Sequence, residues 1–484
     1  MPISRNIVIS SIIWNLLERF SSQIVSFVIS IILARILMPG DYGIIAIVLV
    51  FVNLAGVIVD GGLNTALIQK KDADQTDFST IFWFCLLLSV VLYLALFFVA
   101  PIIAGFYDND VLTGIVRVLS LILISNSLNS IQRAYVSRNM LFKKLFWINA
   151  LSIVLSGLIG IVMAYNGFGV WAIVGQTLAN SFFGCFLLWI CISWRPSMVF
   201  SIDRFRGLFE YGWKIFLSSF IISIYNNAYS LVIGKVYQPS ALAFFDRGKA
   251  FPSLIMSNVT GSIDTVMLPT IAEAQNDRLR VKQMMKRSIQ VSYLFVAPLL
   301  VGFFFVAKDV VIILLTEKWL PTVPFIKIFC VAFLLMPIQT INMTGIKSLG
   351  YSNITLKLEM LKKAIEAVIL IISILINVYA VAWGIVIYNA ICIVINLSPS
   401  KTIVDYGIFE QLGDMFPSCF VALLMGGIVY LCGYLPFNTI SLLIIKVIIG
   451  AFIYYFLCRL FRFDSLAYVT NYLKEAFMNR RSVR

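Results

Sequence analysis

The sequence predicts an all-α polytopic membrane protein with about fourteen transmembrane helices. Of its 484 residues, 61% are hydrophobic and only 12% are charged, and the mean hydropathy is +0.96. Soluble domains are about 45–50% apolar and about 25% charged. Apolar stretches of about twenty residues also recur from end to end, and each is long enough to cross a hydrocarbon core of roughly 30 Å.

The fourteen predicted spans follow one another with short connections. They cover residues 8–36, 42–67, 79–105, 112–135, 146–165, 170–193, 208–235, 241–268, 287–315, 323–346, 355–378, 382–402, 413–434 and 438–460. We expect residues 1–200 to form a first lobe of six helices, 201–403 a second lobe of six, and 404–463 two extra helices. Residues 464–484 have an amphipathic pattern, which predicts either a helix lying on the cytoplasmic leaflet or a frayed basic tail.

The connections predict the orientation of the chain. With the N-terminus inside, Lys and Arg concentrate in the cytoplasmic segments, and the outward connections hold little beyond Lys318. This asymmetry follows the positive-inside rule and predicts that both termini are cytoplasmic. The first apolar stretch is broken by Glu18 and Arg19 and has no small-residue cleavage site, so it predicts a retained helix. The cytoplasmic basic residues before 288 are Arg5, Lys70, Lys71, Arg133, Arg138, Lys143, Lys144, Arg195, Arg204, Arg206, Arg278, Arg280, Lys282, Lys286 and Arg287.

Two short internal matches indicate a repeat. "LARILMPGDYG" at 33–43 is similar to "IGKVYQPSALA" at 233–243, and "WAIV" at 171–174 is similar to "WGIV" at 383–386. The first match aligns Pro39 with Pro239. Because six helices separate the paired segments, both halves enter the membrane from the same side, and their pseudo-axis should run along the membrane normal.

Composition argues against several classes of function. The chain has no histidine, the commonest metal ligand and general base, so we expect neither a metal site nor Ser-His chemistry. Its eight cysteines all lie in apolar segments and are expected to be buried hydrophobes. The net charge of +14 is explained by cytoplasmic loops facing an anionic leaflet, so we expect no nucleic-acid partner. No cofactor is expected.

Charged residues inside the predicted spans are the candidate site residues, because such charges usually face a bundle interior or a watery cavity. Glu18 and Arg19 could instead form structural pairs, and residues near span ends could extend to the interface. Asp60 and Asp264 lie at matching places in the two halves and could be a symmetric structural pair. The candidates outside the eighth span are Glu18, Arg19, Arg35, Asp60, Arg117, Glu210, Lys214, Lys235 and Asp264.

The eighth span contains the densest cluster. Asp246, Arg247 and Lys249 fall within one turn, and Asp246 can neutralise only one of the two cations. Pro252 follows and removes a backbone hydrogen bond, which loosens the helix locally. A residual positive charge beside a loosened helix suits an anion, and we expect a phosphate, because arginine offers it a planar fork and lysine a point charge. Arg247 and Lys249 cannot share one narrow face, so we assign the cavity to Arg247.

"FFDRGKAFPS" at 244–253, followed by "MLPTIAEAQ" at 267–275, resembles the eighth-helix signature of the MOP exporter superfamily. The chain is similar to its lipid II flippases and Wzx-type polysaccharide exporters, and "LARILMPGDYG" resembles the end of their first helix. The resemblance implies two six-helix lobes in a V around a central cavity that opens to each side in turn. In the lipid II flippases the arginine of the D-R-x-x-x-F-P motif is a cavity residue required for transport, which implies this role for Arg247. Arg19, Arg35 and Arg117 are candidates by position only.

We therefore expect a flippase rather than an enzyme. Its cargo would be an undecaprenyl-diphosphate-linked oligosaccharide, moved from the cytoplasmic to the outer leaflet of a bacterial inner membrane for surface polysaccharide biosynthesis. Membrane lipids are expected partners, with a polymerase and glycosyltransferases as further candidates. The alternatives are a MATE-like multidrug or organic-cation antiporter and, less favoured because all loops are short, a membrane glycosyltransferase or ligase.

Overall fold

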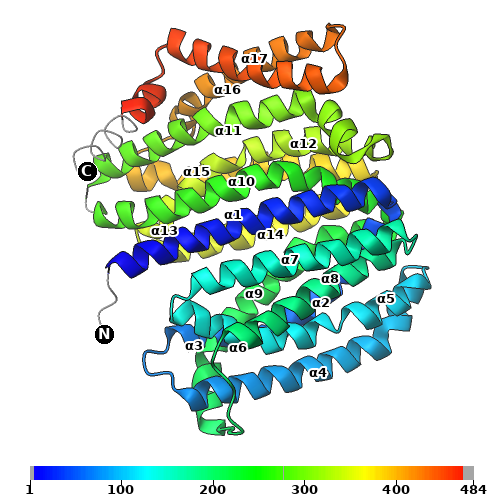
Figure 1. Ribbon diagram of the computed structural model, residues 1–484. Coiled ribbons are helices and arrows are strands. Elements are labelled where there is room, and N and C mark those ends of the chain that lie inside the picture. The colour runs from blue at the N-terminus through cyan, green and yellow to red at the C-terminus, as the bar shows by residue number, and fades with distance from the viewer. Residues whose placement is uncertain (1–4, 276, 472–484) are drawn as a thin grey trace. The chain divides into compact units, whose positions relative to one another are not determined.

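The computed structural model describes residues 5–275 and 277–471. The side chains at 5–13, 16, 262, 264–266, 268, 269 and 352 also lie outside the description. The described chain is built from helices, with no strand among the described residues (Figure 1). The predicted all-α membrane class is confirmed. The chain divides into two compact units, Met1–Ala243 and Phe244–Arg484.

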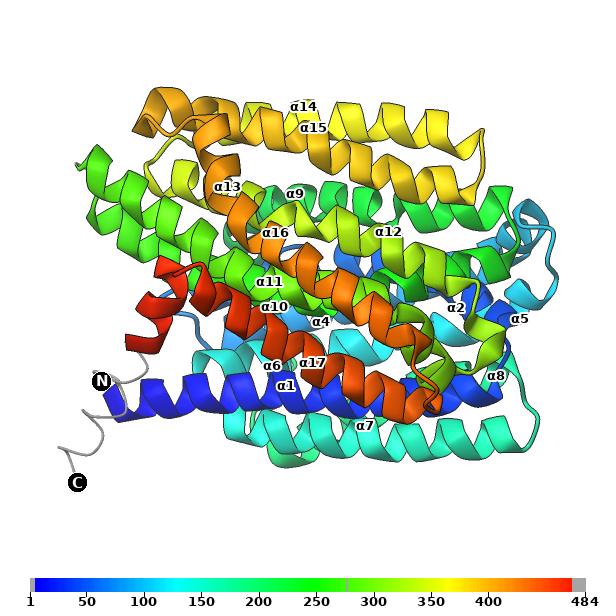
Figure 2. The ribbon, with the colours of Figure 1, turned by 90° about the horizontal axis from the view of Figure 1, so that it is seen from above.

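The first unit is organised by helix pairs. α7 packs against α1 and α8, α4 packs against α5 and α6, and α2 packs against α9. α1 and α7 lie side by side in both views (Figures 1 and 2). The helices are α1 (Arg5–Ile36), α2 (Pro39–Asp60), α3 (Leu63–Gln69), α4 (Gln75–Phe106), α5 (Val111–Leu119), α6 (Ile122–Arg138), α7 (Phe142–Tyr165), α8 (Val170–Cys191) and α9 (Ile202–Val236).

In the second unit α11 packs against α12, α16 and α17, and α14 packs against α15 (Figure 2). The helices are α10 (Pro239–Glu273, which begins in the first unit), α11 (Arg278–Leu315), η1 (Glu317–Trp319), α12 (Thr322–Leu334), α13 (Met336–Ser348), α14 (Ser352–Ile374), α15 (Val378–Val404), α16 (Ile408–Leu431), η2 (Cys432–Tyr434) and α17 (Thr439–Leu460). The predicted lobe boundary at 200 differs from the division at 243, because α9 packs against α2, α3 and α4.

Twelve segments of the described chain are long and apolar enough to cross a membrane. The protein is therefore a multi-pass membrane protein, but the predicted count of fourteen is not confirmed. The two predicted spans outside the twelve correspond to α10 and α14. α14 carries two ion pairs that our set of intramembrane charges omitted. Lys362 contacts Glu359 at 2.7 Å, and Lys363 contacts Glu366 at 2.8 Å.

The repeated segments occupy equivalent places in the chain. α1 ends at Ile36 and α2 begins at Pro39, whereas α9 ends at Val236 and α10 begins at Pro239. Proline suits a first helical position, because the missing N–H would have no intrahelical partner there. The beginnings of α2 and α10 also contact each other. A Cβ on Gly43 would lie 1.7 Å from the Pro239 carbonyl oxygen, so only glycine permits this contact between α2 and the start of α10.

A glycine break bends the chain between α2 and α3. Gly61 and Gly62 have φ values of +53° and +68°, a region that L side chains rarely adopt. A Cβ on Gly62 would lie 2.4 Å from the Gly212 carbonyl oxygen of α9. Glycine at this position therefore lets α9 approach the break closely, next to Asp60, the last residue of α2.

In the second unit, residues after α17 pack back onto the protein. Residues 464–471 are helical, and Leu466 and Val469 pack against the buried core that includes Tyr293 and Tyr406. Their apolar side chains therefore contact the protein in the described part of the tail. Leu473 and Phe477, which continue the spacing of Leu466 and Val469 in the predicted amphipathic pattern, lie outside the described residues.

Candidate substrate cavity

A polar face on α6 is the starting point of the site. Asn126, Asn129, Ser130, Arg133 and Ser137 recur at intervals of three or four residues, so they project from one side of the helix. The opposite side carries Ile131, which is fully buried. A polar face on a helix that crosses a membrane must be covered by other helices or must border a water-filled space.

That face borders a cavity of about 950 Å³ in the first unit. The cavity walls come from α2, α3, α6, α8 and α9, and they contribute amide, hydroxyl and charged side chains. Ligand cavities typically measure about 300–1,000 Å³, so this one could accommodate a group of several sugar rings. The polar side chains in its walls are Asn53, Asp60, Asn64, Asn126, Asn129, Ser130, Arg133, Ser137, Thr177, Ser219, Ser223 and Asn227.

Arg133 is the cavity residue that sequence reasoning missed. We had assigned it to a cytoplasmic connection, but it lies inside α6 and lines two cavities of the first unit. Its side chain is exposed, and it makes no hydrogen bond or ion pair among the described residues. The signal that could have found it is the helical spacing of Asn126, Asn129 and Arg133, because these residues share one face.

Asp60, a predicted site residue, also lines the larger cavity. The Asn64 side-chain amide donates hydrogen bonds to Asp60 Oδ1 and to Ser130 Oγ. These contacts connect the end of α2 to α3 and α6, so Asp60 has a structural role as well as a place in the wall. Asp264, its proposed counterpart in α10, has a side chain outside the described residues.

Two other predicted residues contact α4. Arg117 Nε donates to the Phe97 carbonyl at 3.2 Å, and its guanidinium lies 4.4 Å from the centre of the Phe97 ring. Lys235 pairs with Asp108 at 3.1 Å and also donates to the Phe106 carbonyl. Neither lines the two cavities that contain Arg133.

Arg19 and Arg35 on α1 are both exposed and are likewise absent from the walls of those two cavities. Position along a predicted span therefore did not predict which arginine borders the larger cavity.

The cluster of the eighth span lies in the second unit, on α10. Phe245 and Gly248 face α12, and a Cβ on Gly248 would lie 2.4 Å from the Phe325 Cβ. The Arg247 guanidinium lies 5.7 Å from the centre of the buried Trp319 ring. Asp246 and Lys249 are three residues apart and are neighbours on the helix surface, whereas adjacent residues such as Asp246 and Arg247 point apart. The three side chains are therefore divided between two faces of α10.

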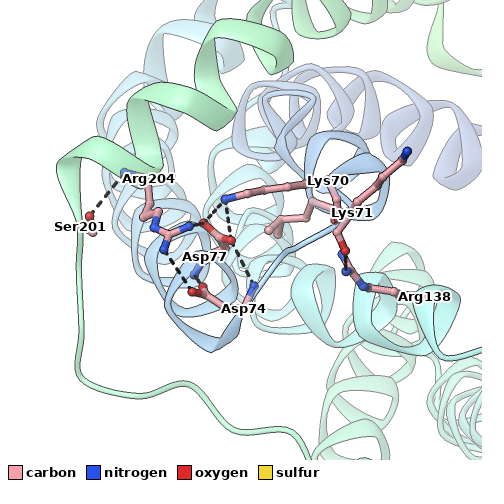
Figure 3. A network of polar contacts seen from close by, with 8 residues as sticks. Lys70, Lys71, Asp74, Asp77, Arg138, Ser201 and Arg204 are labelled. Carbon is pink, nitrogen blue, oxygen red and sulfur yellow. Dashed lines mark hydrogen bonds and ion pairs between the residues drawn. The ribbon is translucent and has the colours of Figure 1, made fainter. Parts of the chain in front are cut away.

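A charged network joins the loop before α4 to the start of α9 (Figure 3). Lys70 pairs with the fully buried Asp77 at 2.7 Å, and Arg204 lies 3.3 Å from Asp74 and 3.7 Å from Asp77. The hydrogen bond from the Asp77 backbone N–H to Asp74 holds the pKa of Asp74 below its ordinary value, and Arg204 adds to this effect. The network fixes α9, one wall of the larger cavity, to the α3–α4 loop.

Arg138 extends this arrangement to the end of α6. Its guanidinium donates to the carbonyls of Leu67, Lys70 and Lys71 at 3.1, 2.7 and 2.6 Å (Figure 3). A cation is well placed there, because the last carbonyls of a helix have no intrahelical donors. Basic residues that we counted only for orientation therefore also hold the cavity helices together.

No metal centre is apparent in the described part of the chain, where no group of three or more Cys, Asp or Glu side chains could hold an ion. The two cavities that Arg133 lines offer carboxamides, hydroxyls, that one arginine and two carboxylates, Asp60 and Glu18. These groups can bind and release polar ligands through hydrogen bonds. Together, the apolar helices and the polar cavity define a multi-pass helical membrane protein with an internal binding space.

The chain belongs to the family described as polysaccharide biosynthesis protein, whose sequence profile matches residues 32–324. It is 24% identical over 306 residues to the succinoglycan biosynthesis transport protein ExoT of Rhizobium meliloti (strain 1021), with 63% of this chain and 62% of ExoT covered. It is 24% identical over 291 residues to the teichuronic acid biosynthesis protein TuaB of Bacillus subtilis (strain 168), with 60% of each chain covered. The match thus spans less than two thirds of these relatives.

Two solved structures show the same fold. The lipid II flippase MurJ in an inward closed conformation superposes with a TM-score of 0.74 at 16% identity, covering 94% of this chain and all of that one. An inward-facing multidrug resistance MATE family transporter of the MOP superfamily gives a TM-score of 0.60 at 15% identity, covering 81% of this chain and 98% of that one. At these identities the likeness concerns the fold alone, and it agrees with the superfamily that the residue motifs indicated.

Proposed function

We propose that this protein is a flippase for a polyprenyl-diphosphate-linked oligosaccharide in surface polysaccharide biosynthesis. The observation that carries the proposal is the cavity of about 950 Å³, whose walls present amide and hydroxyl groups inside an apolar helical shell. Sugars offer many hydroxyls that both donate and accept hydrogen bonds, and carboxamides can satisfy both kinds of partner. Family membership and the name of ExoT, a biosynthesis transport protein, support the same cargo class.

In this proposal the glycan head passes through the polar cavity while the prenyl tail remains in lipid. No bond is made or broken, so the protein is a transporter rather than an enzyme. We place it in the inner membrane of a bacterium with both termini cytoplasmic, because Lys and Arg concentrate in the predicted cytoplasmic connections. Arg247 is our candidate contact for the diphosphate, since a planar guanidinium can bind phosphate oxygens in pairs.

A second candidate is an organic-cation antiporter. It is favoured by one observation, which is that Asp60 and Glu18 place carboxylates in cavity walls of the first unit. Such groups would attract a cationic drug. Arg133 in both walls opposes this attraction. The family match concerns polysaccharide biosynthesis, so the flippase is the better supported function.

The test is transport by the purified full chain in proteoliposomes. The probe is a fluorescent polyprenyl diphosphate carrying a short neutral oligosaccharide, and its transfer between leaflets is followed with a membrane-impermeant quencher. We expect faster transfer than in protein-free vesicles, and little uptake of ethidium. Ethidium transport without transfer of the lipid probe would favour the antiporter.

A further inference from the structure

A second, smaller cavity lies behind Arg133 in the first unit. It measures about 360 Å³ and is enclosed by α1, α6, α7 and α8. It shares Asn126, Asn129 and Arg133 with the larger cavity, so the two spaces adjoin along one face of α6. This inference rests on the proposed function and assigns one part of the cargo to one part of the site.

Four carboxamides contribute to the walls of this smaller cavity, namely Asn126, Asn129, Asn149 and Asn180. Hydrogen bonds to neighbouring helices use only some of the donors and acceptors of these four carboxamides. Asn149 donates to Glu18 at 2.7 Å, and Asn126 accepts from Ser181 at 3.3 Å. Asn129 and Asn180 form no hydrogen bond among the described residues. If these amides served only to join helices, each would be expected to form hydrogen bonds to a neighbouring helix, and Asn129 and Asn180 do not within the described chain.

Asn129 is the most informative of the four. Its side chain is only 4% exposed, and its Oδ1 atom has no hydrogen-bond partner among the described residues. Leaving a buried acceptor unpaired costs about 1–3 kcal/mol. Asn129 lines the adjoining cavity, so rotation of its amide toward a ligand hydroxyl there would remove this cost, which is a physical reason to expect a hydroxyl-bearing ligand.

Glu18 determines the charge that this ligand can carry. Its carboxylate is held by Asn149 and by Ser22, whose hydroxyl donates at 3.5 Å. Glu18 lines the cavity together with Arg133, so the nearby positive charge is already opposed by a negative one. A carboxylate can accept hydrogen bonds from sugar hydroxyls, but it repels the carboxylate of an acidic sugar. The pocket thus favours an uncharged sugar.

We propose that the cavity between α1, α6, α7 and α8 is a selectivity pocket for one neutral sugar residue of the lipid-linked glycan. The larger cavity would hold the rest of the head group. Asn129 and Asn180 supply hydrogen bonds to sugar hydroxyls, and Glu18 excludes uronic acids. None of these roles requires contact with the diphosphate.

The test measures binding to the full chain in lipid nanodiscs. The probes are polyprenyl diphosphate without sugar, the same lipid carrying glucose, galactose or N-acetylglucosamine, and the same lipid carrying glucuronate. We expect at least one neutral sugar to bind about tenfold more tightly than the bare lipid, and glucuronate to bind no better than it. Asn129→Leu and Asn180→Leu should each remove most of this advantage, and Asn180→Leu, which changes the smaller cavity but not the larger one, should leave the affinity for the bare lipid unchanged.

Glu18→Gln should improve glucuronate binding toward that of the neutral sugars. Asn166→Leu, at the end of α7 and outside both cavities, is the matched control and should behave as wild type. Asn180 is exposed and without a partner among the described residues, so its variant should fold normally. Equal binding of all sugar-bearing and bare lipids would contradict the proposed selectivity pocket but would leave the proposed flippase function intact. Failure of every polyprenyl diphosphate to bind would overturn the proposed function and this inference with it.

Discussion

The guanidinium of Arg247 lies 5.7 Å from the centre of the Trp319 ring, and Trp319 is fully buried. The contact joins α10 to the short helix before α12 and holds a flat cation in one orientation. Cation–π contacts of this kind contribute about 0.5–2 kcal/mol. Lys249 lies about 200° away around the helix from Arg247, so the two residues have different surroundings and should respond differently to substitution.

We expect Arg247→Ala to reduce transfer of the lipid-linked probe by tenfold or more. Arg247→Lys should also be damaging, because an ammonium lacks the planar fork of a guanidinium. Lys249→Ala, Asp60→Asn and Asp264→Asn should have smaller effects at matched protein amounts in the same proteoliposome assay. Full activity of a well-folded Arg247→Ala variant would show that the cluster is structural.

Arg133 and Arg117 form a matched pair of arginines within the first unit. Arg133→Gln should reduce transfer several-fold with little change in melting temperature, since it lines the cavities and bonds to no described residue. Arg117→Gln should instead destabilise the protein by about 1–2 kcal/mol, because it loses the Phe97 contacts. Transport and thermal unfolding measured on both variants test this, and the reverse pattern would contradict the assignment of Arg133 to the site.

Asp77 should be a stability residue of the first unit. It is fully buried and accepts hydrogen bonds from Lys70 and from the Asp74 backbone N–H (Figure 3). Asp77→Asn should cost roughly 2–3 kcal/mol, because charged hydrogen bonds are lost. Asp72→Asn, an exposed neighbour, should be neutral in the same thermal unfolding measurement. Equal melting temperatures for both variants would argue against the network.

Asp74 predicts a small dependence of stability on pH. Its pKa is lower in the folded protein than in the unfolded chain, so its contribution is fully present above about pH 4 and is lost as the pH falls through the folded pKa. The wild-type melting temperature should therefore fall more steeply than that of Asp74→Asn between pH 4.5 and 3. Parallel curves for the two proteins would exclude this contribution.

The orientation can be tested with single cysteines on a cysteine-free background. We expect cysteines at positions 72, 198 and 279 to be reached only from the cytoplasmic side, and one at 110 only from outside. These positions are all exposed, so labelling reports the side of the membrane rather than burial. External labelling at 72, 198 or 279 in sealed cells would break the predicted orientation.

The sequence by itself determined the membrane class and the helical architecture. Hydrocarbon demands long apolar segments whose backbone groups are satisfied internally, and this requirement is readable residue by residue. The helix starts at Pro39 and Pro239 also follow a local rule, because proline suits the first helical position, although the predicted spans began at 42 and 241. The motif around Arg247 indicated the superfamily because it is a contiguous string of residues, which can be recognised without knowing the fold.

The tertiary structure decided which charges share a space. Arg117 and Arg133 both lie within Val111–Arg138, one of the segments long enough to cross a membrane, yet Arg117 contacts Phe97 of α4 and Arg133 lines the cavities. That outcome depends on how each helix is rotated against its neighbours, and rotation follows from close contacts between distant residues. The close approach of Gly62 to Gly212 is such a contact. Hydropathy reports how apolar a helix is, but only packing determines the partner that each face meets.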